Sequence, residues 1–142
     1  TSRGLGDVYK RQISGGALVY LIGTKYGRTL PLIIGISMSS IFTFLLHYSD
    51  NVSIYFIANT ITGIAWGFTI PYILGLCSTF DSHGQMAALA GFISKMGLAT
   101  GPLIGSLFII DYGIGPIINI AVFSLIVAMI ASWLSSRAIE TK

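Results

Sequence analysis

The chain has 142 residues, of which 54% are hydrophobic and 9% are charged, and its formal net charge is +3. A soluble domain usually carries about a quarter charged residues. This composition therefore excludes an ordinary soluble globular domain and predicts a membrane protein.

The first twelve residues differ from everything that follows. Residues 1–12 are polar and hold three of the eight basic side chains. The run from Asp7 to Gln12 also resembles the in-frame translation of a transposon-end adapter used in sequencing libraries. We interpret residues 1–12 as a non-native segment in front of a fragment of a longer protein; a genuine short amphipathic terminus is the alternative. Without this segment the net charge is +1 (five basic minus four acidic residues), which argues against a nucleic-acid partner.

Hydrophobic runs predict an all-α fold, a polytopic bundle of transmembrane helices. A helix that crosses the hydrocarbon core needs about 20 mostly apolar residues. Residues 13–22 are too few and are expected to be the tail of a truncated span. Residues 13–142 would then form one partial transmembrane domain, with complete spans expected at residues 30–46, 52–76, 85–110 and 116–134.

The charges of the loops predict how the chain is oriented. Lys25 and Arg28 flank Gly27 in the turn before the first complete span, and Arg137 and Lys142 lie in the polar tail. The loops after the first and third complete spans contain acids but no Lys or Arg. Because cytoplasmic loops are enriched in Lys and Arg, we expect the basic turn and the C-terminus to face the cytoplasm.

The second complete span carries small residues and a proline at four-residue steps. Gly63 and Gly67 are expected to let another helix approach closely. Pro71 is expected either to bend the helix or only to end a regular stretch.

The third complete span contains one full charge, Lys95, near its middle. A cation inside the membrane is costly and usually faces a cavity or a partner. At about 100° per residue, Gly91, Ala99, Pro102 and Ser106 share its face. Lys95 is therefore a candidate for a substrate pathway; a static ion pair, or snorkelling towards the headgroups, is the alternative.

A second stripe on the same span consists of glycines four residues apart. Gly97, Gly101 and Gly105, with Pro102 between them, are expected to form a close-contact or gating face.

Two motifs and the order of the spans resemble the last third of a major facilitator superfamily transporter, about helices eight to twelve. Lys25, Gly27 and Arg28 match three positions of the family's inner-turn pattern G-x-x-x-D-R-x-G-R-R, whereas its acidic residue is absent here. The run from Gly97 to Gly105 resembles the pattern G-x-x-x-G-P-x-x-G of helix five in the family's antiporters.

The resemblance implies a secondary active transporter that moves a small solute across the plasma membrane by alternating access, together with a missing N-terminal half. Helix ten of this family borders the central cavity, so the resemblance makes Asn59, Thr60, Thr62 and Trp66 candidate substrate contacts. The alternative for these polar residues is hydrogen bonding between helices.

Two other classes of protein are less consistent with the sequence. A small membrane protein that is complete at this length and self-associates through its glycines is the main alternative to a transporter. An enzyme is not expected, because the spans contain no paired acids or histidine clusters. Two scattered histidines and one cysteine predict no metal site, and no cofactor is expected.

Overall fold

The computed structural model describes residues 15–21, 23, 25, 27–80 and 83–140. These residues form helices and turns and no strand. The predicted non-native segment, residues 1–12, lies outside the described residues.

Four long helices follow a short helical stretch at residues 15–21, here called segment 15–21. All four are long and apolar enough to cross a membrane, which confirms the prediction of an all-α bundle with helices of membrane-spanning length and composition. Their bounds are α2 Thr29–Leu45, extended by the 3₁₀ turn η1 Leu46–Tyr48, then α3 Val52–Cys77, α4 Gln85–Tyr112 and α5 Ile114–Glu140.

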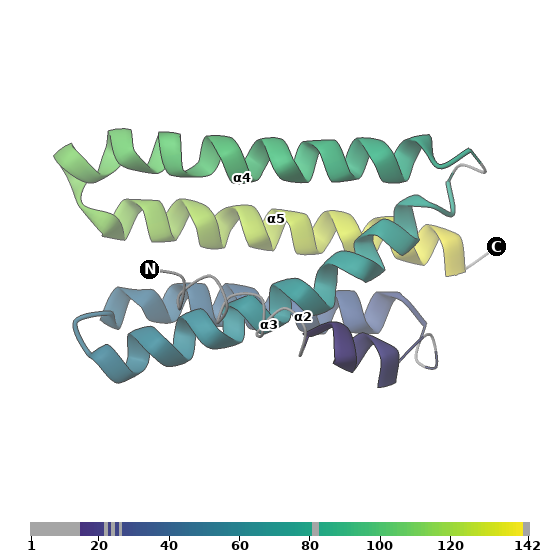
Figure 1. Ribbon diagram of the computed structural model, residues 1–142, viewed down its shortest axis with the longest axis horizontal. Coiled ribbons are helices and arrows are strands. Elements are labelled where there is room, and N and C mark those ends of the chain that lie inside the picture. Colours follow the sequence, from purple (N-terminus) through teal and green to yellow (C-terminus); the bar gives the residue numbers. More distant parts are fainter. Residues whose placement is uncertain (1–14, 22, 24, 26, 81–82, 141–142) are drawn as a thin grey trace, which may run out of the picture.

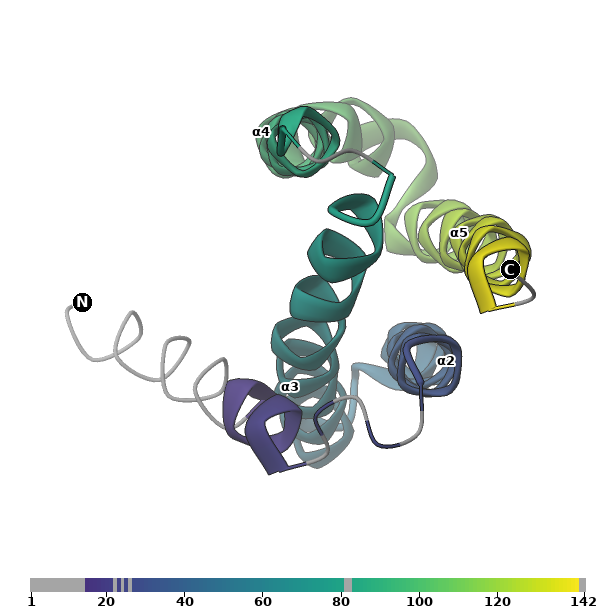
Figure 2. The same cartoon turned by 90° about the vertical axis from the view of Figure 1, so that its right-hand side faces the viewer.

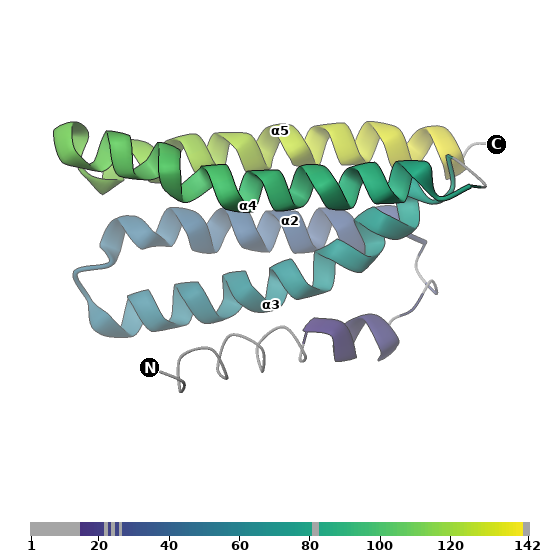
Figure 3. The same ribbon diagram turned by 45° about the horizontal axis from the view of Figure 1, so that its top comes forward.

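The helices run up and down alongside one another (Figure 1 and Figure 3). α2 packs against both α3 and α5, whereas α4 makes few contacts with the rest of the chain. Figure 2, which looks along the bundle, shows α3 slanting from the side of α2 towards the start of α4. The basic turn before α2 and the end of α5 lie at the same end of the bundle.

A small core joins three of the helices at that end. Leu32 of α2 and Phe68, Tyr72 and Leu76 of α3 are buried against one another, and Ile139 of α5 packs on this cluster. Dispersion contacts in such a cluster stabilise a bundle even where lipid removes the hydrophobic driving force between helices.

Two hydrogen bonds hold the basic turn against the end of α3. The Arg28 guanidinium donates to the carbonyl of Gly75 at 2.7 Å, and the Tyr72 hydroxyl donates to the carbonyl of Gly23 at 2.9 Å. The last carbonyls of a helix lack helical partners and carry partial negative charge. The Gly75 carbonyl also accepts from the Ser78 hydroxyl at 2.8 Å, so the arginine is its second donor and complements the helix dipole.

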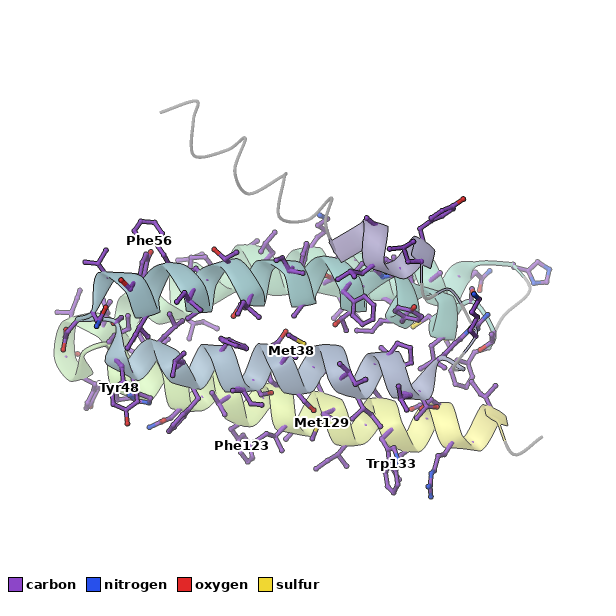
Figure 4. The ribbon with its side chains drawn as sticks, turned by 90° about the horizontal axis from the view of Figure 1, so that it is seen from below. Met38, Tyr48, Phe56, Phe123, Met129 and Trp133 are labelled. Atoms are coloured by element: carbon purple, nitrogen blue, oxygen red, sulfur yellow. The ribbon has the colours of Figure 1, made fainter. Side chains whose placement is uncertain are left out.

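Much of the remaining surface is apolar and exposed. Phe56 of α3 and Phe123 of α5 point away from the bundle in Figure 4 and are 56% and 68% exposed. No residue of α4 is buried. Long apolar helices with such surfaces need lipid or further helices around them.

The ends of the last two helices differ from the sequence prediction. The expected turn at residues 111–115 is reduced to Gly113, because its φ of 72° reverses the chain in one residue and α5 begins at Ile114. The sequence predicts a span at residues 116–134 followed by a polar tail, and α5 continues through that tail to Glu140. Polar residues are compatible with a helix that leaves the membrane, so polarity marks the end of a span and not the end of a helix.

Candidate functional site

The path of α3 is set in part by Pro71. Proline lacks an N–H, so the carbonyl of Gly67, four residues earlier, loses its helical hydrogen bond. Prolines are a usual cause of bends in long helices. α3 bends in its C-terminal half, which carries that half away from α2 and towards α4 (Figure 1 and Figure 2).

A cavity of about 620 Å³ lies where α3 crosses between α2 and α4. Ligand pockets commonly measure about 300–1,000 Å³. Its wall combines apolar side chains with a few polar groups from facing helices. Ile36 and Ser39 come from α2, Trp66 and Thr69 from α3, Ser94 and Lys95 from α4, and Leu125 from α5.

Lys95 is the charged residue of this wall. It lies ten residues after Gln85, the start of α4, which places it about 15 Å along the helix at about 1.5 Å per residue. Half the thickness of a bilayer core is about 15 Å. An ammonium at that depth is strongly disfavoured in lipid, but a cavity can accommodate it.

The cavity contains part of the set of residues that the sequence singled out. Lys95 of α4 lines it together with Trp66, Gly67 and Pro71 of α3. Residues from two helices that the sequence treated separately therefore meet at one place. Pro71 contributes to the wall of the cavity and also lies at the bend of α3.

The three other candidate substrate contacts, Asn59, Thr60 and Thr62, lie outside the cavity wall. The Asn59 side chain donates to the carbonyl of Tyr55 in its own helix at 2.9 Å. The Thr62 hydroxyl oxygen is buried and has no hydrogen-bond partner within the described part of the chain. Thr60 and the half-buried Gly63 also lie on α3 away from this wall.

The glycine stripe of α4 has no neighbour among the described residues. A Cβ atom added at Gly97, Gly101 or Gly105 would meet no atom within 4 Å outside the local helix backbone. Pro102 lies inside α4 between them and is exposed. Close packing at this stripe stays a prediction.

The matched residues of the basic turn have different surroundings. Arg28 bonds α3 as described above, whereas the Lys25 side chain is exposed. Gly27 has a φ of 72°, in the left-handed region that favours glycine. These residues shape one end of the bundle and do not belong to the cavity wall.

The sequence analysis did not identify several residues of the wall. Ser39 and Thr69 are buried, and the Thr69 hydroxyl donates to the carbonyl of Ala65 at 2.7 Å. Ser94 precedes Lys95 directly. Single hydroxyl residues are common in apolar helices, so the sequence gives no signal for these three. They can be recognised only from the structure, in which their helices line one cavity.

No group of three or more His, Cys, Asp or Glu residues that could hold a metal ion occurs in the described part of the chain. The cavity wall offers one ammonium, an indole and several hydroxyls. Such groups bind and orient a ligand.

Comparison with protein-family models, curated proteins and solved structures finds no match to this chain.

Proposed function

We propose that this chain is part of a secondary transporter of the major facilitator type, which moves a small solute across the plasma membrane by alternating access. The observation that carries this proposal is the cavity between α3 and α4, lined by Lys95, within a set of helices long enough to span the membrane. A cation at mid-helix together with a proline-bent neighbour is typical of helices that line a solute pathway.

Further helices of the same transporter would be the partners of this chain. None of the residues of α4 is fully buried, although this helix carries a charge and a glycine stripe. In a transporter with two helical halves, the other half would close the cavity and cover α4. The small solute and the lipid bilayer are the remaining partners in this proposal.

The distribution of charge supports a cytoplasmic C-terminus. Lys25, Arg28 and Arg137 lie at one end of the bundle, whereas Asp50 and Asp111 lie at the other. Arg137 also stacks over the Trp133 ring, 4.7 Å from its centroid. Basic side chains are enriched on the cytoplasmic side of membrane proteins, and Trp is enriched at both membrane interfaces.

Alternating access predicts that one wall residue is reached by water from both sides of the membrane. In the transporter that contains this chain, with Cys77→Ser and any cysteines of the other half replaced, we expect Ser94→Cys to react with a membrane-impermeant thiol reagent added to either side of oriented vesicles. The matched control is Phe92→Cys, which lies two residues away and thus about 200° round the helix. Phe92 is 63% exposed on the apolar face and is expected to stay unlabelled.

Labelling of Ser94→Cys from one side only, or from neither, would contradict transport by this chain. A second candidate function, self-association without transport, predicts that result. The unoccupied glycine face of α4 is the observation that favours this second candidate.

A further inference from the structure

If the chain is part of a solute transporter, as proposed above, the charge of the cavity wall indicates the class of solute. Among the described residues that line the cavity, Lys95 carries the one formal charge and none is acidic. The Lys95 side chain is exposed within this chain, but at this depth in a membrane lipid or the other half of the transporter would remove its ammonium from water. A charge removed from water needs an opposite charge close to it. A bound anion would supply that charge.

The charge of the ligand follows from the requirement that the single positive charge of Lys95 be neutralised. A single carboxylate neutralises Lys95. A dianion would bring one uncompensated negative charge into the cavity, and a zwitterion would bring an ammonium for which this wall offers no acid. A neutral ligand would leave Lys95 itself unpaired. Because burying an unpaired charge costs far more than burying a paired one, the wall favours a monoanion.

The rest of the wall determines the body of the ligand. Apart from the polar groups already named and the small residues Gly67, Ala90 and Gly91, it consists of larger aliphatic side chains and proline, namely Ile36, Ile70, Pro71, Ile73, Leu74 and Leu125. Trp66 adds an aromatic face, against which a planar ring stacks favourably. The donor of the Thr69 hydroxyl already bonds Ala65 within α3. A sugar, which needs a partner for each hydroxyl, would leave several groups unsatisfied here.

We propose that the cavity binds an organic monoanion with an apolar, aromatic body, with its carboxylate on Lys95 and its ring against Trp66 and the aliphatic wall. Ser94 lies one residue from Lys95 on the same wall and offers a hydroxyl donor to the same carboxylate. Benzoate is the simplest molecule of this class.

Binding of labelled benzoate to the full chain in lipid nanodiscs, measured by equilibrium dialysis, tests this proposal. Benzyl alcohol, phthalate and phenylalanine serve as the neutral, dianionic and zwitterionic counterparts of the same ring. We expect saturable binding of benzoate and at least about tenfold weaker binding of each of the other three, because each loses or adds one uncompensated charge.

Two variants show whether Lys95 is responsible. Lys95→Met keeps the length of the side chain and removes its charge, and we expect it to weaken benzoate binding at least about tenfold. Lys25→Met removes the same charge from an exposed residue outside the wall, and we expect it to change nothing. Trp66→Leu should weaken benzoate binding while leaving the order of the four ligands unchanged.

The proposal is overturned if benzoate fails to bind the unmodified chain, if phthalate or phenylalanine binds more tightly, or if the two lysine variants bind equally well. The comparison of four ligands needs no variant, so it decides even if Lys95→Met does not fold. A different result would show that the proposed transport function is wrong while the proposed ligand class is right. Benzoate binding that depends on Lys95, without labelling of Ser94→Cys from both sides, would support this ligand class and contradict transport.

Discussion

Gly15→Ala is expected to detach segment 15–21 from α3 and to lower the thermal stability of the protein. A Cβ atom at Gly15 would lie 2.5 Å from the carbonyl oxygen of Ile64, 2.8 Å from the amide nitrogen of Phe68 and 2.9 Å from the carbonyl carbon of Gly67. All three are backbone atoms of α3, so no side chain can turn aside. Overpacking of this kind typically costs about 1–3 kcal/mol.

Gly16→Ala is the matched control for this prediction. It lies next to Gly15 in the same helical segment, but a Cβ atom there would meet nothing within 4 Å. Both substitutions gain about 1 kcal/mol of helix propensity. The difference between them therefore isolates the contact with α3. Thermal unfolding in detergent, followed by tryptophan fluorescence, should place Gly15→Ala below Gly16→Ala; equal midpoints would refute the close approach of the two backbones.

Gly35→Ala is expected to destabilise the contact between α2 and α3. A Cβ atom at Gly35 would overlap the hydroxyl oxygen of Thr69, and it would lie 3.2 Å from the Phe68 ring. The hydroxyl is held in place by its bond to Ala65. Relief requires breaking that bond or separating the helices, and we expect a cost of about 1–3 kcal/mol.

A double-mutant cycle with Thr69→Ala tests the cause of this loss. Removing the hydroxyl makes room for the new methyl group, because the next Thr69 atom, its Cβ, is 3.4 Å away. The double variant should therefore be more stable than the sum of the single effects predicts, by about 0.5–3 kcal/mol. Gly75→Ala, where a Cβ atom meets nothing within 4 Å, controls for the change of glycine to alanine. If the stability changes of Gly35→Ala and Thr69→Ala were strictly additive, a clash between the new methyl group and Thr69 would be refuted.

The existence of the long helices could be read from the sequence, because apolar runs of this length have few other structures. Their ends could not. Gly113 alone separates α4 from α5, and the polar residues after Leu134 continue the last helix to Glu140. Helix ends depend on caps and local backbone angles, which composition does not encode.

The role of each glycine could not be predicted from spacing alone. Gly97, Gly101 and Gly105 have the regular pattern, yet no described helix approaches them. Gly15 and Gly35 belong to no such pattern, but a neighbouring helix lies against each. Spacing identifies a smooth face, whereas the tilt and rotation of the helices determine which smooth faces meet.

The sequence predicted some residues of the candidate site but not others. Lys95 could be singled out because a charge inside an apolar helix is energetically costly, and Trp66 could be singled out from the family resemblance. Asn59 lies on the same helix as Trp66 but bonds its own backbone. The bend near Pro71 determines which side of α3 faces α4, and the sequence left open whether Pro71 bends the helix at all.

The most direct test of a solute-binding cavity inside the membrane is the surroundings of Ser94. A nitroxide attached to Ser94→Cys or Phe92→Cys, in the Cys77→Ser protein in lipid bilayers, collides with oxygen in lipid and with a water-soluble nickel chelate in aqueous spaces. We predict that the chelate dominates at Ser94, which lines the cavity, and that oxygen dominates at Phe92. Oxygen-dominated collisions at both positions would mean that the wall containing Lys95 faces lipid, which would contradict the cavity and the function proposed for it.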